Sequence, residues 1–322
     1  MPQALPRIIA IVGATASGKT ALGIAIARAV DGEVIACDSR TIYQGMDIGT
    51  AKPKGDRITA AMTGNLAALA GPPTFLVEGV VHWGFDLVAP DQAFSAADFQ
   101  AFADKTIADI VKRGKVPILV GGTGFYLSAI LDRVSLAHVP PNPELRAAMA
   151  MQSNEELLEE IAKRDPDAAS VIDAKNRRRL ERALEVIIGT GGTFAAARRE
   201  ESPRYEALRL GVAVEREELF ERINARVDAM VAEGLIDEVR RLFTRYGPDA
   251  PGMSGIGYRQ LTESFLGKVS LREAVLQVKQ DSRDYARRQE TWFKRDERIV
   301  WIKNISDAID RATSFIGHVG DV

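Results

Sequence analysis

The chain has 322 residues, of which 46% are hydrophobic and 27% charged, and this composition is typical of a globular protein with more than one ordinary domain. No apolar run approaches the roughly 18 residues that span a bilayer, no secretory signal begins the chain, and Cys37 is the only cysteine, so we expect a cytoplasmic protein without membrane spans, disulfides or a zinc site of the usual spacing. The net charge of −2 gives no general attraction for nucleic acid, although residues 175–182 and 283–298 are locally basic and form either solvated helix faces or phosphate-binding patches.

The first part of the chain alternates strands with helices. Strands are predicted from short β-branched or apolar runs, and helices from apolar residues spaced along one face. The predicted elements are a strand at 7–12, a glycine loop at 13–20, a helix at 21–30, a strand at 33–38, a helix at 97–114 and a strand at 116–120. This alternation predicts an α/β fold with a parallel sheet flanked by helices.

The pattern changes after about Leu131. A proline-rich break at 139–143 precedes a nearly all-helical segment, and later residues return to the core. The later predicted elements are a strand at 209–214, helices over 216–246 with a break at Gly234, a helix at 272–294 and a strand at 298–302. We therefore predict a first core part at 1–136, an all-helical insertion domain at 137–200 and a returning core part at 201–322.

The glycine loop fits a phosphate-binding pattern, because a strand precedes it and a helix follows. Its backbone amides and the helix N-terminus would favour anionic oxygens, Lys19 would add a charge, and the Thr20 hydroxyl would ligate Mg²⁺. The residues concerned are Gly13, Ala14, Thr15, Ala16, Ser17, Gly18, Lys19 and Thr20. The motif predicts a core like that of the P-loop NTPases and a bound di- or triphosphate, but not which bond breaks.

Two further segments should reach the same edge of the sheet. Asp38 follows the second strand, where it suits a metal ligand, a general base or a cap for the next turn equally well. Residues 121–124 (GGTG) follow the third strand, and either form a tight turn or let the backbone and the Thr123 hydroxyl approach a ligand.

Residues 38–53 (DSRTIYQGMDIGTAKP) closely resemble the signature of the tRNA dimethylallyltransferase family. Other segments resemble family motifs in the family's order, so that the resemblance covers about residues 8–301. These segments are residues 94–99, 120–126, 179–185, 255–260 and 287–293.

The resemblance implies a reaction in which N6 of the adenosine 3′-adjacent to the tRNA anticodon attacks C1 of dimethylallyl diphosphate. The glycine loop would hold the diphosphate, Lys19 and Mg²⁺ would stabilise its developing charge, and Asp38 would act as general base. Thr123 would position the amine or a phosphate oxygen, and Arg222, or Arg226 one turn later, would add a guanidinium.

The resemblance also implies the residues that contact RNA. The target base must leave its stack to enter a pocket, and the helical insertion would grip the anticodon stem-loop. The core residues would be Asp38, Ser39, Arg40, Thr41, Thr123, Ser254, Gly255, Ile256, Gly257, Tyr258 and Arg259, and the insertion residues would be Arg146, Arg178, Arg179 and Arg182. We expect a monomer, because such binding needs no symmetric partner.

The sequence departs from the family pattern in two places. A histidine-rich stretch is represented by His82 alone, a weak match that follows an apparent insertion at 63–79. The cysteines of a zinc-finger tail found in eukaryotic relatives are absent, which points to a bacterial-type enzyme.

Two other functions would share the glycine loop. A small-molecule kinase would explain the loop and the α/β core, but it would not explain residues 38–53 and 255–260. A nucleotide-binding RNA module without catalysis would have no use for Asp38, because a carboxylate facing a phosphate site repels the ligand.

Overall fold

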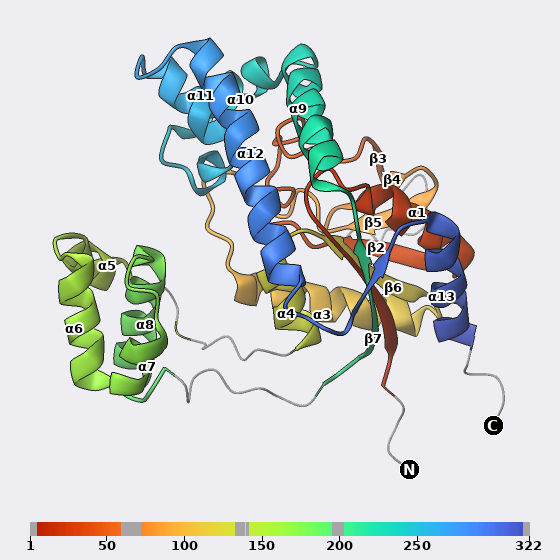
Figure 1. The fold of residues 1–322 in the computed structure, drawn as a ribbon, viewed down its shortest axis with the longest axis horizontal. Helices are drawn as coiled ribbons and strands as arrows, with labels where there is room; N and C mark the ends of the chain where they lie inside the picture. Colours follow the sequence, from red (N-terminus) through yellow and green to blue (C-terminus); the bar gives the residue numbers. More distant parts are fainter. Residues whose placement is uncertain (1–4, 59–71, 133–138, 140–141, 195–202, 318–322) are drawn as a thin grey trace. The chain divides into compact units, whose positions relative to one another are not determined.

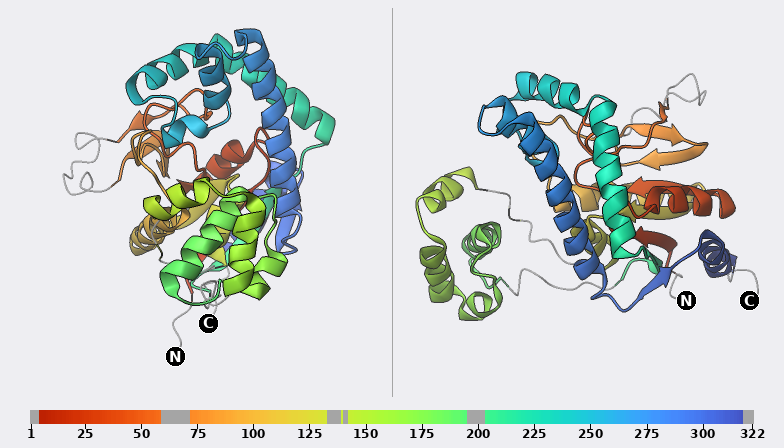
Figure 2. Two further views of the ribbon diagram at one scale, coloured as in Figure 1. Left: turned by 90° about the vertical axis from the view of Figure 1, so that its left-hand side faces the viewer. Right: turned by 45° about the horizontal axis from the view of Figure 1, so that its top comes forward.

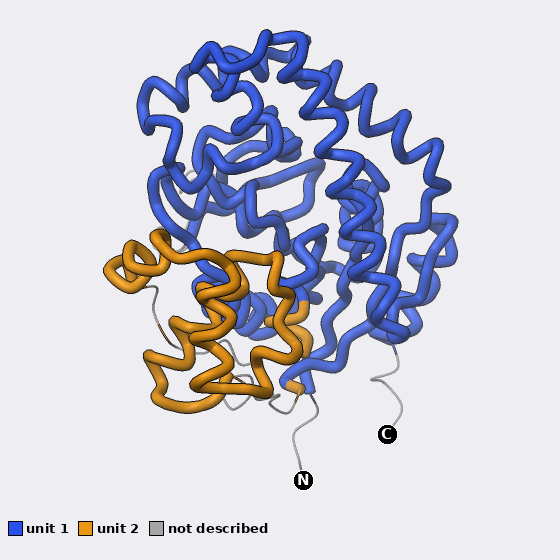
Figure 3. The backbone as a smooth tube through the Cα atoms, turned by 60° about the vertical axis from the view of Figure 1, so that its left-hand side comes forward, with its two compact units in different colours: residues 1–127, 204–322 blue, residues 128–203 orange. Residues whose placement is uncertain are grey.

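The structure is a computed structural model that describes residues 5–58, 72–132, 139, 142–194 and 203–317. The chain forms two compact units (Figure 3). Unit 1 is discontinuous and comprises residues 1–127 and 204–322, whereas unit 2 is the continuous segment 128–203.

Unit 1 is built on one eight-stranded sheet with the strand order β3-β4-β5-β2-β6-β1-β7-β8 (Figure 1). The strands are β1 (Arg7–Val12), β2 (Gly32–Ala36), β3 (Asp56–Arg57), β4 (Thr74–Val77), β5 (Val80–Trp83), β6 (Val116–Gly121), β7 (Glu206–Val212) and β8 (Ile299–Ile302). The six strands from β5 to β8 in this order are parallel, which confirms the predicted parallel sheet flanked by helices for most of its width.

One edge of the sheet departs from the predicted parallel arrangement. There β3 and β4 run antiparallel, and β4 joins β5 through a two-residue turn. Glu78 and Gly79 in this turn both have positive φ, at 49° and 81°, as the tight hairpins that match strand twist require. The hairpin takes up part of the segment interpreted as an insertion, of which residues 63–71 lie outside the described residues.

The core of unit 1 lies on both faces of the sheet. Alternate residues such as Ile9 and Ile118 form one cluster with α1 (Lys19–Ala29), and the same face carries α13 (Ile305–Gly317) (Figure 2). The opposite set of residues is also fully buried, and α3 (Ala96–Lys112) packs against β2 and β6.

A group of helices stands beyond the carboxyl ends of the strands. The long helical stretch predicted with a break at Gly234 is confirmed, because Gly234 has φ 106° between two helices. Tyr258 lies in their common cluster with residues of the loop after β2. The elements are α9 (Arg216–Ala232), α10 (Leu235–Tyr246), the 3-10 turn η2 (Pro251–Ser254), α11 (Tyr258–Phe265) and α12 (Leu271–Phe293).

Unit 2 is helical in its described part. It begins within α4 (Gly124–Leu131), and its own core includes Leu157, Ile161, Leu180 and Leu184. The helices are α5 (Pro143–Ala150), α6 (Asn154–Arg164), α7 (Pro166–Val171) and α8 (Arg177–Thr190). Across the described ranges of both units, none of the helices combines the length and the apolarity needed to cross a bilayer.

Candidate active site

Three loops that follow neighbouring strands meet at one edge of the sheet. The glycine loop follows β1, Asp38 follows β2 and Thr123 follows β6, and these strands are adjacent in the order β2-β6-β1. The Thr123 hydroxyl accepts a hydrogen bond from the Ser39 amide at 3.1 Å, and the Thr123 amide donates to the Cys37 carbonyl at 3.2 Å. The parallel sheet therefore brings the predicted base and the predicted positioning hydroxyl together.

The glycine loop has the backbone geometry of an anion site. Gly18 starts α1 with φ 97°, and no side chain caps the first amides of that helix. At Gly13, a Cβ atom would lie only 3.2 Å from the Val212 carbonyl oxygen, so the close approach of β7 requires glycine there. Uncapped amides at a helix N-terminus carry partial positive charge and can bind phosphate oxygens.

The pKa of Lys19 is shifted from its usual value towards neutral pH. Its ammonium donates to the Ala14 carbonyl at 2.5 Å within the glycine loop. The pKa of Lys19 is lowered to about 8, because the effect of burial outweighs that of the Asp38 carboxylate, which raises the pKa, and Arg226 adds a smaller lowering effect. The lysine, the arginine and the aspartate therefore share one electrostatic environment.

A pocket of about 300 Å³ opens beside these loops, within unit 1. Its lining includes a few charged side chains, several apolar side chains and a group of uncharged residues. The lining residues are Thr15, Asp38, Ser39, Arg40, Gly49, Thr50, Ala51, Ile223, Arg226, Val227, Met230, Leu235, Ser254, Ile256, Gly257, Tyr258, Val278, Ser282, Tyr285 and Arg288. We call Gly49, Thr50, Ala51, Ile256, Gly257 and Tyr258 the neutral wall.

The structure separates the two arginines that the sequence leaves as alternatives on α9. Arg222 is exposed, forms an ion pair with Glu218 at 2.5 Å and does not line the pocket. Arg226 lines the pocket, and no hydrogen-bond or ion-pair partner faces its side chain among the described residues. The geometry thus favours Arg226 as the guanidinium available to a ligand, with Arg288 of α12 as a second one.

Arg40 connects the loop after β2 to the segment before α11. Its guanidinium donates to the Ser254 hydroxyl at 3.1 Å and to the Pro251 carbonyl at 3.3 Å. Asp38 in turn accepts from the Arg40 amide at 2.8 Å through Oδ1. These contacts join two segments at one pocket. Both segments are predicted to contact RNA, and they lie more than 200 residues apart in the sequence.

Helix α12 contributes residues that sequence reasoning missed. Val278, Ser282 and Tyr285 line the pocket from one face of the helix, and Gln289 continues this face. Gln289 is buried, accepts from the Thr15 amide at 2.8 Å and donates to the Gly122 carbonyl at 2.9 Å. These four residues are spaced at i, i+4, i+7 and i+11, which places them on one face of a helix. This pattern could have identified them from the sequence, but the arginines of the segment obscured it.

Tyr285 stands close to the predicted catalytic groups. Burial raises the pKa of its hydroxyl to about 12, with a further contribution from the Asp38 carboxylate, and the hydroxyl is hydrogen-bonded to Thr123. The phenol therefore stays protonated at neutral pH and can only act as a hydrogen-bonding group there.

Several residues predicted for RNA contact do not line the pocket. Thr41 is buried, Gly255 is buried beside Arg40, and Arg259 forms an ion pair with Asp281 at 2.8 Å. His82 lies in β5 rather than in a loop, with Nδ1 3.0 Å from the Val80 carbonyl, and burial lowers its pKa. His82 is accordingly a neutral core residue and not part of the pocket lining.

The four arginines predicted to grip RNA all lie in unit 2, but their side chains differ. Arg146 and Arg182 both form ion pairs with Glu185, whose carboxylate is fully buried. The exposed side chains of Arg178 and Arg179 have no hydrogen-bond or ion-pair partner in the part of the chain that the structure describes. The latter two are free to meet an external phosphate, while Arg146 and Arg182 are held by their own unit.

The described ranges contain no group of three or more histidine, cysteine, aspartate or glutamate side chains that could hold a metal ion. Near the glycine loop, the side-chain oxygens include the exposed Thr20 hydroxyl, the Asp38 carboxylate and the buried Ser17 hydroxyl, which has no hydrogen-bond partner among the described residues. Mg²⁺ in general keeps several waters and binds through one or two protein groups plus substrate phosphates.

Comparison with known proteins identifies similar chains over nearly the full length. Residues 41–296 match the IPP transferase family. A tRNA dimethylallyltransferase of Roseiflexus sp. (strain RS-1) is 42% identical over 315 residues, which cover 96% of this chain and 97% of that protein. A tRNA dimethylallyltransferase of Geobacillus thermodenitrificans is also 42% identical, over 92% of this chain and 90% of that protein.

Solved structures show the same similarity. The full-length tRNA isopentenylpyrophosphate transferase of Bacillus halodurans superposes with a TM-score of 0.67 at 36% identity, covering 97% of this chain and 96% of that chain. A eukaryotic dimethylallyltransferase acting on tRNA shares the fold, with a TM-score of 0.76 at 24% identity over 97% of this chain and 80% of that chain.

Proposed function

The chain belongs to the IPP transferase family, and from this membership we infer its reaction and propose the roles of its residues. The protein is a tRNA dimethylallyltransferase, a prenyltransferase that modifies tRNA. It transfers the dimethylallyl group of dimethylallyl diphosphate to N6 of the adenosine 3′-adjacent to the anticodon. The N6–C1 bond forms, the C1–O bond breaks with its electron pair leaving on diphosphate, and N6 loses a proton.

One observation carries the assignment of residues to this reaction. A single pocket is lined by Thr15 of the glycine loop, by Asp38 and by residues 254 and 256–258. Diphosphate ligands suit the first segment, and the resemblance assigns the last to tRNA. A donor and an acceptor held in one pocket can react without a separate encounter.

We propose that the diphosphate binds at the charged end of the pocket. Arg226 lines the pocket there, Lys19 lies close enough to share its electrostatic environment, and no side chain caps the first amides of α1. Negative charge grows on the diphosphate as the C1–O bond stretches, so fixed donors and cations at this end stabilise the transition state more than the ground state. The core around this loop is of the P-loop NTPase kind in this proposal.

Asp38 is the proposed general base. Its Oδ1 accepts from the Arg40 amide, which fixes the carboxylate, and Oδ2 has no partner among the described residues. Oδ2 can therefore take the N6 proton or orient the amine. Thr123, which holds the Ser39 amide and meets Tyr285, would keep this loop in place beside the acceptor.

A bound Mg²⁺ would be held by Thr20, by the diphosphate oxygens and by water. The exposed hydroxyl and the absence of any three-residue metal cluster in the described ranges fit this weakly held ion. When bound, the ion would supply positive charge to the leaving diphosphate.

We propose that unit 2 contacts the anticodon stem-loop through Arg178 and Arg179, whose side chains are exposed and unpaired within the described residues. Arg146 and Arg182 would then shape this surface through Glu185. The pocket is complete within one chain, which supports a monomer as the active form.

The experiment that tests this function follows the prenyl group. Purified protein is mixed with radiolabelled dimethylallyl diphosphate, Mg²⁺ and unmodified tRNA, and label in the RNA is counted. We expect label that requires Mg²⁺ and disappears when the target adenosine is replaced. If no label enters RNA and ATP is instead consumed with a small-molecule acceptor, the protein is a kinase and the proposal is wrong.

A further inference from the structure

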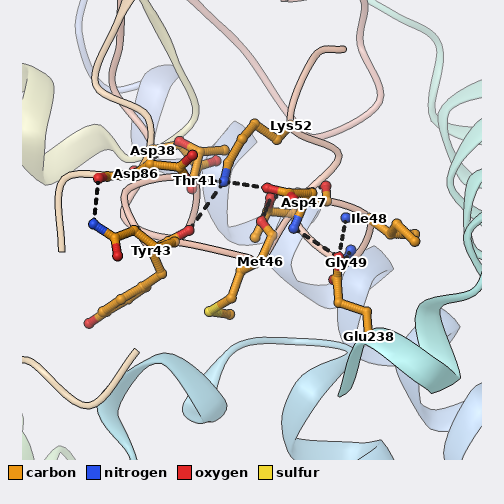
Figure 4. A network of polar contacts seen from close by, with 12 residues as sticks. Asp38, Thr41, Tyr43, Met46, Asp47, Ile48, Gly49, Lys52, Asp86 and Glu238 are labelled. Atoms are coloured by element: carbon orange, nitrogen blue, oxygen red, sulfur yellow. Dashed lines mark hydrogen bonds and ion pairs between the residues drawn. The ribbon is translucent and has the colours of Figure 1, made fainter. Parts of the chain in front are cut away.

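A buried carboxylate holds the neutral wall of the pocket from behind. Glu238 lies on the first turn of α10 and is only 2% exposed. Its Oε2 accepts from the amides of Asp47 and Ile48 at 3.0 and 2.8 Å, and its Oε1 accepts from the Gly49 amide at 3.0 Å (Figure 4). Three successive backbone amides therefore converge on one side chain.

A fourth donor completes this arrangement from another segment. The Tyr258 hydroxyl donates to Glu238 Oε1 at 2.6 Å, and Tyr258 is 1% exposed. Burial, and then the negative charge of Glu238, raise the pKa of Tyr258 well above its usual range, so its hydroxyl remains a donor. All four groups that face the carboxylate are thus donors, which matches an ionised glutamate.

No cation neutralises Glu238 among the described residues. The nearby Lys52 ammonium instead forms ion pairs with Asp47 at 2.6 Å and Asp86 at 2.5 Å, and donates to the Tyr43 carbonyl at 3.1 Å (Figure 4). A buried charge without a counter-ion depends on its hydrogen bonds, so each of the four donors matters to the position of the loop.

These bonds fix backbone that the pocket uses directly. Gly49 and Tyr258 are packed so closely that a Cβ atom on Gly49 would lie 2.6 Å from the Tyr258 ring. Ala51, two residues further on, has φ 52°, a conformation that alanine rarely adopts unless its surroundings hold it. Gly49, Thr50, Ala51 and Tyr258 all line the pocket.

The neutral wall consists of uncharged residues, and the guanidinium groups of the lining are those of Arg40, Arg226 and Arg288, with Lys19 near Arg226. In the proposed function the diphosphate binds beside Arg226 and Lys19, so the neutral wall suits the uncharged base. The wall also includes residues 256–258, next to Ser254, which Arg40 ties to the Asp38 loop.

We propose that Glu238 is a positioning residue for the acceptor adenosine, acting by holding the neutral wall in place relative to Asp38. This role rests on the proposed function. Glu238 does not touch the substrate in this proposal. It sets the backbone of residues 47–49 and the hydroxyl of Tyr258, and these in turn determine where the base is held for attack.

The test compares Glu238→Gln with the unaltered enzyme in steady-state transfer of label to tRNA, and in calorimetric binding of dimethylallyl diphosphate without tRNA. A glutamine NH₂ must face two of the four donors, so at least one loop amide loses its partner whichever way the amide group is turned. We expect kcat/KM for tRNA to fall by about 100-fold, the effect of a misplacement near 1 Å. The dissociation constant of the donor should stay within about twofold.

Glu33→Gln is the matched control. Glu33 is equally buried, at 2% exposure, but it bonds Arg113 and Trp83 from the beginning of β2, at the end of the strand opposite to Asp38. We expect Glu33→Gln to lower the thermal midpoint and leave the transfer kinetics unchanged at a temperature where it is folded. Tyr258→Phe removes one donor and keeps the three amides. Its kcat/KM for tRNA should therefore fall less than that of Glu238→Gln.

Each outcome decides between the possibilities. Unchanged tRNA kinetics in Glu238→Gln and Tyr258→Phe would overturn the proposal, as would an equal loss in Glu33→Gln. A parallel loss in donor binding would overturn the assignment to the acceptor side. If Glu238→Gln does not fold, Tyr258→Phe alone carries the test. An unaltered enzyme that transfers no label would instead contradict the proposed function.

Discussion

At the residue scale, the proposed general base Asp38 can be tested by a substitution that keeps its shape. We expect Asp38→Asn to lower turnover by about 10²- to 10⁴-fold, because the amide cannot take the N6 proton. The amide oxygen can still accept from the Arg40 amide, so the loop should persist. Single-turnover transfer of label measures the loss, and calorimetry should show donor binding nearly unchanged.

The same variant separates the roles of Asp38. A large rise in the donor dissociation constant with little loss of turnover would contradict the role of general base. Recovery of turnover at high Mg²⁺ would identify Asp38 as a metal ligand instead. Asp38→Ala also removes the hydrogen bond that the Arg40 amide donates to Asp38, and it should show the same loss of turnover.

Lys19 gives the site a pH dependence that an ordinary lysine would not. Its pKa is lowered to about 8, so the ammonium is charged below this pH and loses its proton as the pH rises through it. We expect the affinity for dimethylallyl diphosphate to be constant between pH 6.5 and 7.5 and to fall by about tenfold per pH unit well above pH 8. Calorimetric titration across pH 6.5–9.5 measures this profile.

Lys19→Arg is the control for this profile, because a guanidinium stays charged throughout the range. Its affinity should be lower or similar but flat between pH 8 and 9.5. A profile for the unaltered protein that stays flat to pH 9.5 would show that Lys19 keeps its proton in the folded chain.

Single residues also mark what the sequence could predict. The pattern of residues 13–20 and the position of Asp38 after a strand lead to the same edge of the sheet that the structure shows. The choice between Arg222 and Arg226 was beyond the sequence, because residues four apart share a helix face. In the structure, Arg226 lines the pocket, whereas Arg222 does not and forms an ion pair with Glu218.

At the element scale, α12 links two loops through one amide side chain. Gln289 satisfies the Thr15 amide and the Gly122 carbonyl at once, which requires both a donor and an acceptor. We expect Gln289→Met to lower the free energy of unfolding by about 1–3 kcal/mol, because both buried backbone groups lose their partner. Denaturant unfolding measures this, and weaker donor binding should accompany it since Thr15 lies in the glycine loop.

Gln277→Met on the same helix is the matched control. Gln277 is exposed and bonds only Asp281 of its own helix, at 2.7 Å. Its loss should change the free energy of unfolding by less than about 0.5 kcal/mol. If both variants were equally stable, Gln289 would not hold the loops.

Elements were easier to predict than their tertiary partners. The break at Gly234 and the strand at β8 follow from local glycine and apolar signals, and both are confirmed. The hairpin of β4 and β5 was missed because Glu78-Gly79 is a weaker turn signal than Asn-Gly. Helix α13 was missed because the role of its apolar residues becomes clear only when they pack against the sheet.

At the scale of the whole molecule, RNA binding should depend on unit 2 as well as on the pocket. We expect the double variant Arg178→Ala, Arg179→Ala to weaken tRNA binding and to reduce the salt dependence of log K by about two, one for each lost phosphate contact. Filter binding at several salt concentrations measures both, and donor affinity should not change.

Arg164→Ala provides the comparison within unit 2. Arg164 is also exposed, but it lies on α6 and pairs with Glu160 at 2.8 Å. Its removal should leave the salt dependence unaltered. An equal effect of the two substitutions would show that charge in general, rather than the start of α8, attracts the RNA.

The interrupted path of the chain has a consequence for synthesis. In the sheet β1 lies between β6, which precedes unit 2, and β7, which follows it. The ribosome releases all of residues 128–203 before β7 and the helices α9 to α12 exist. The helical unit can therefore complete its core while β1 still lacks one neighbour and the pocket lacks most of its lining. Each newly made copy can thus complete its helical unit before it gains the ability to react.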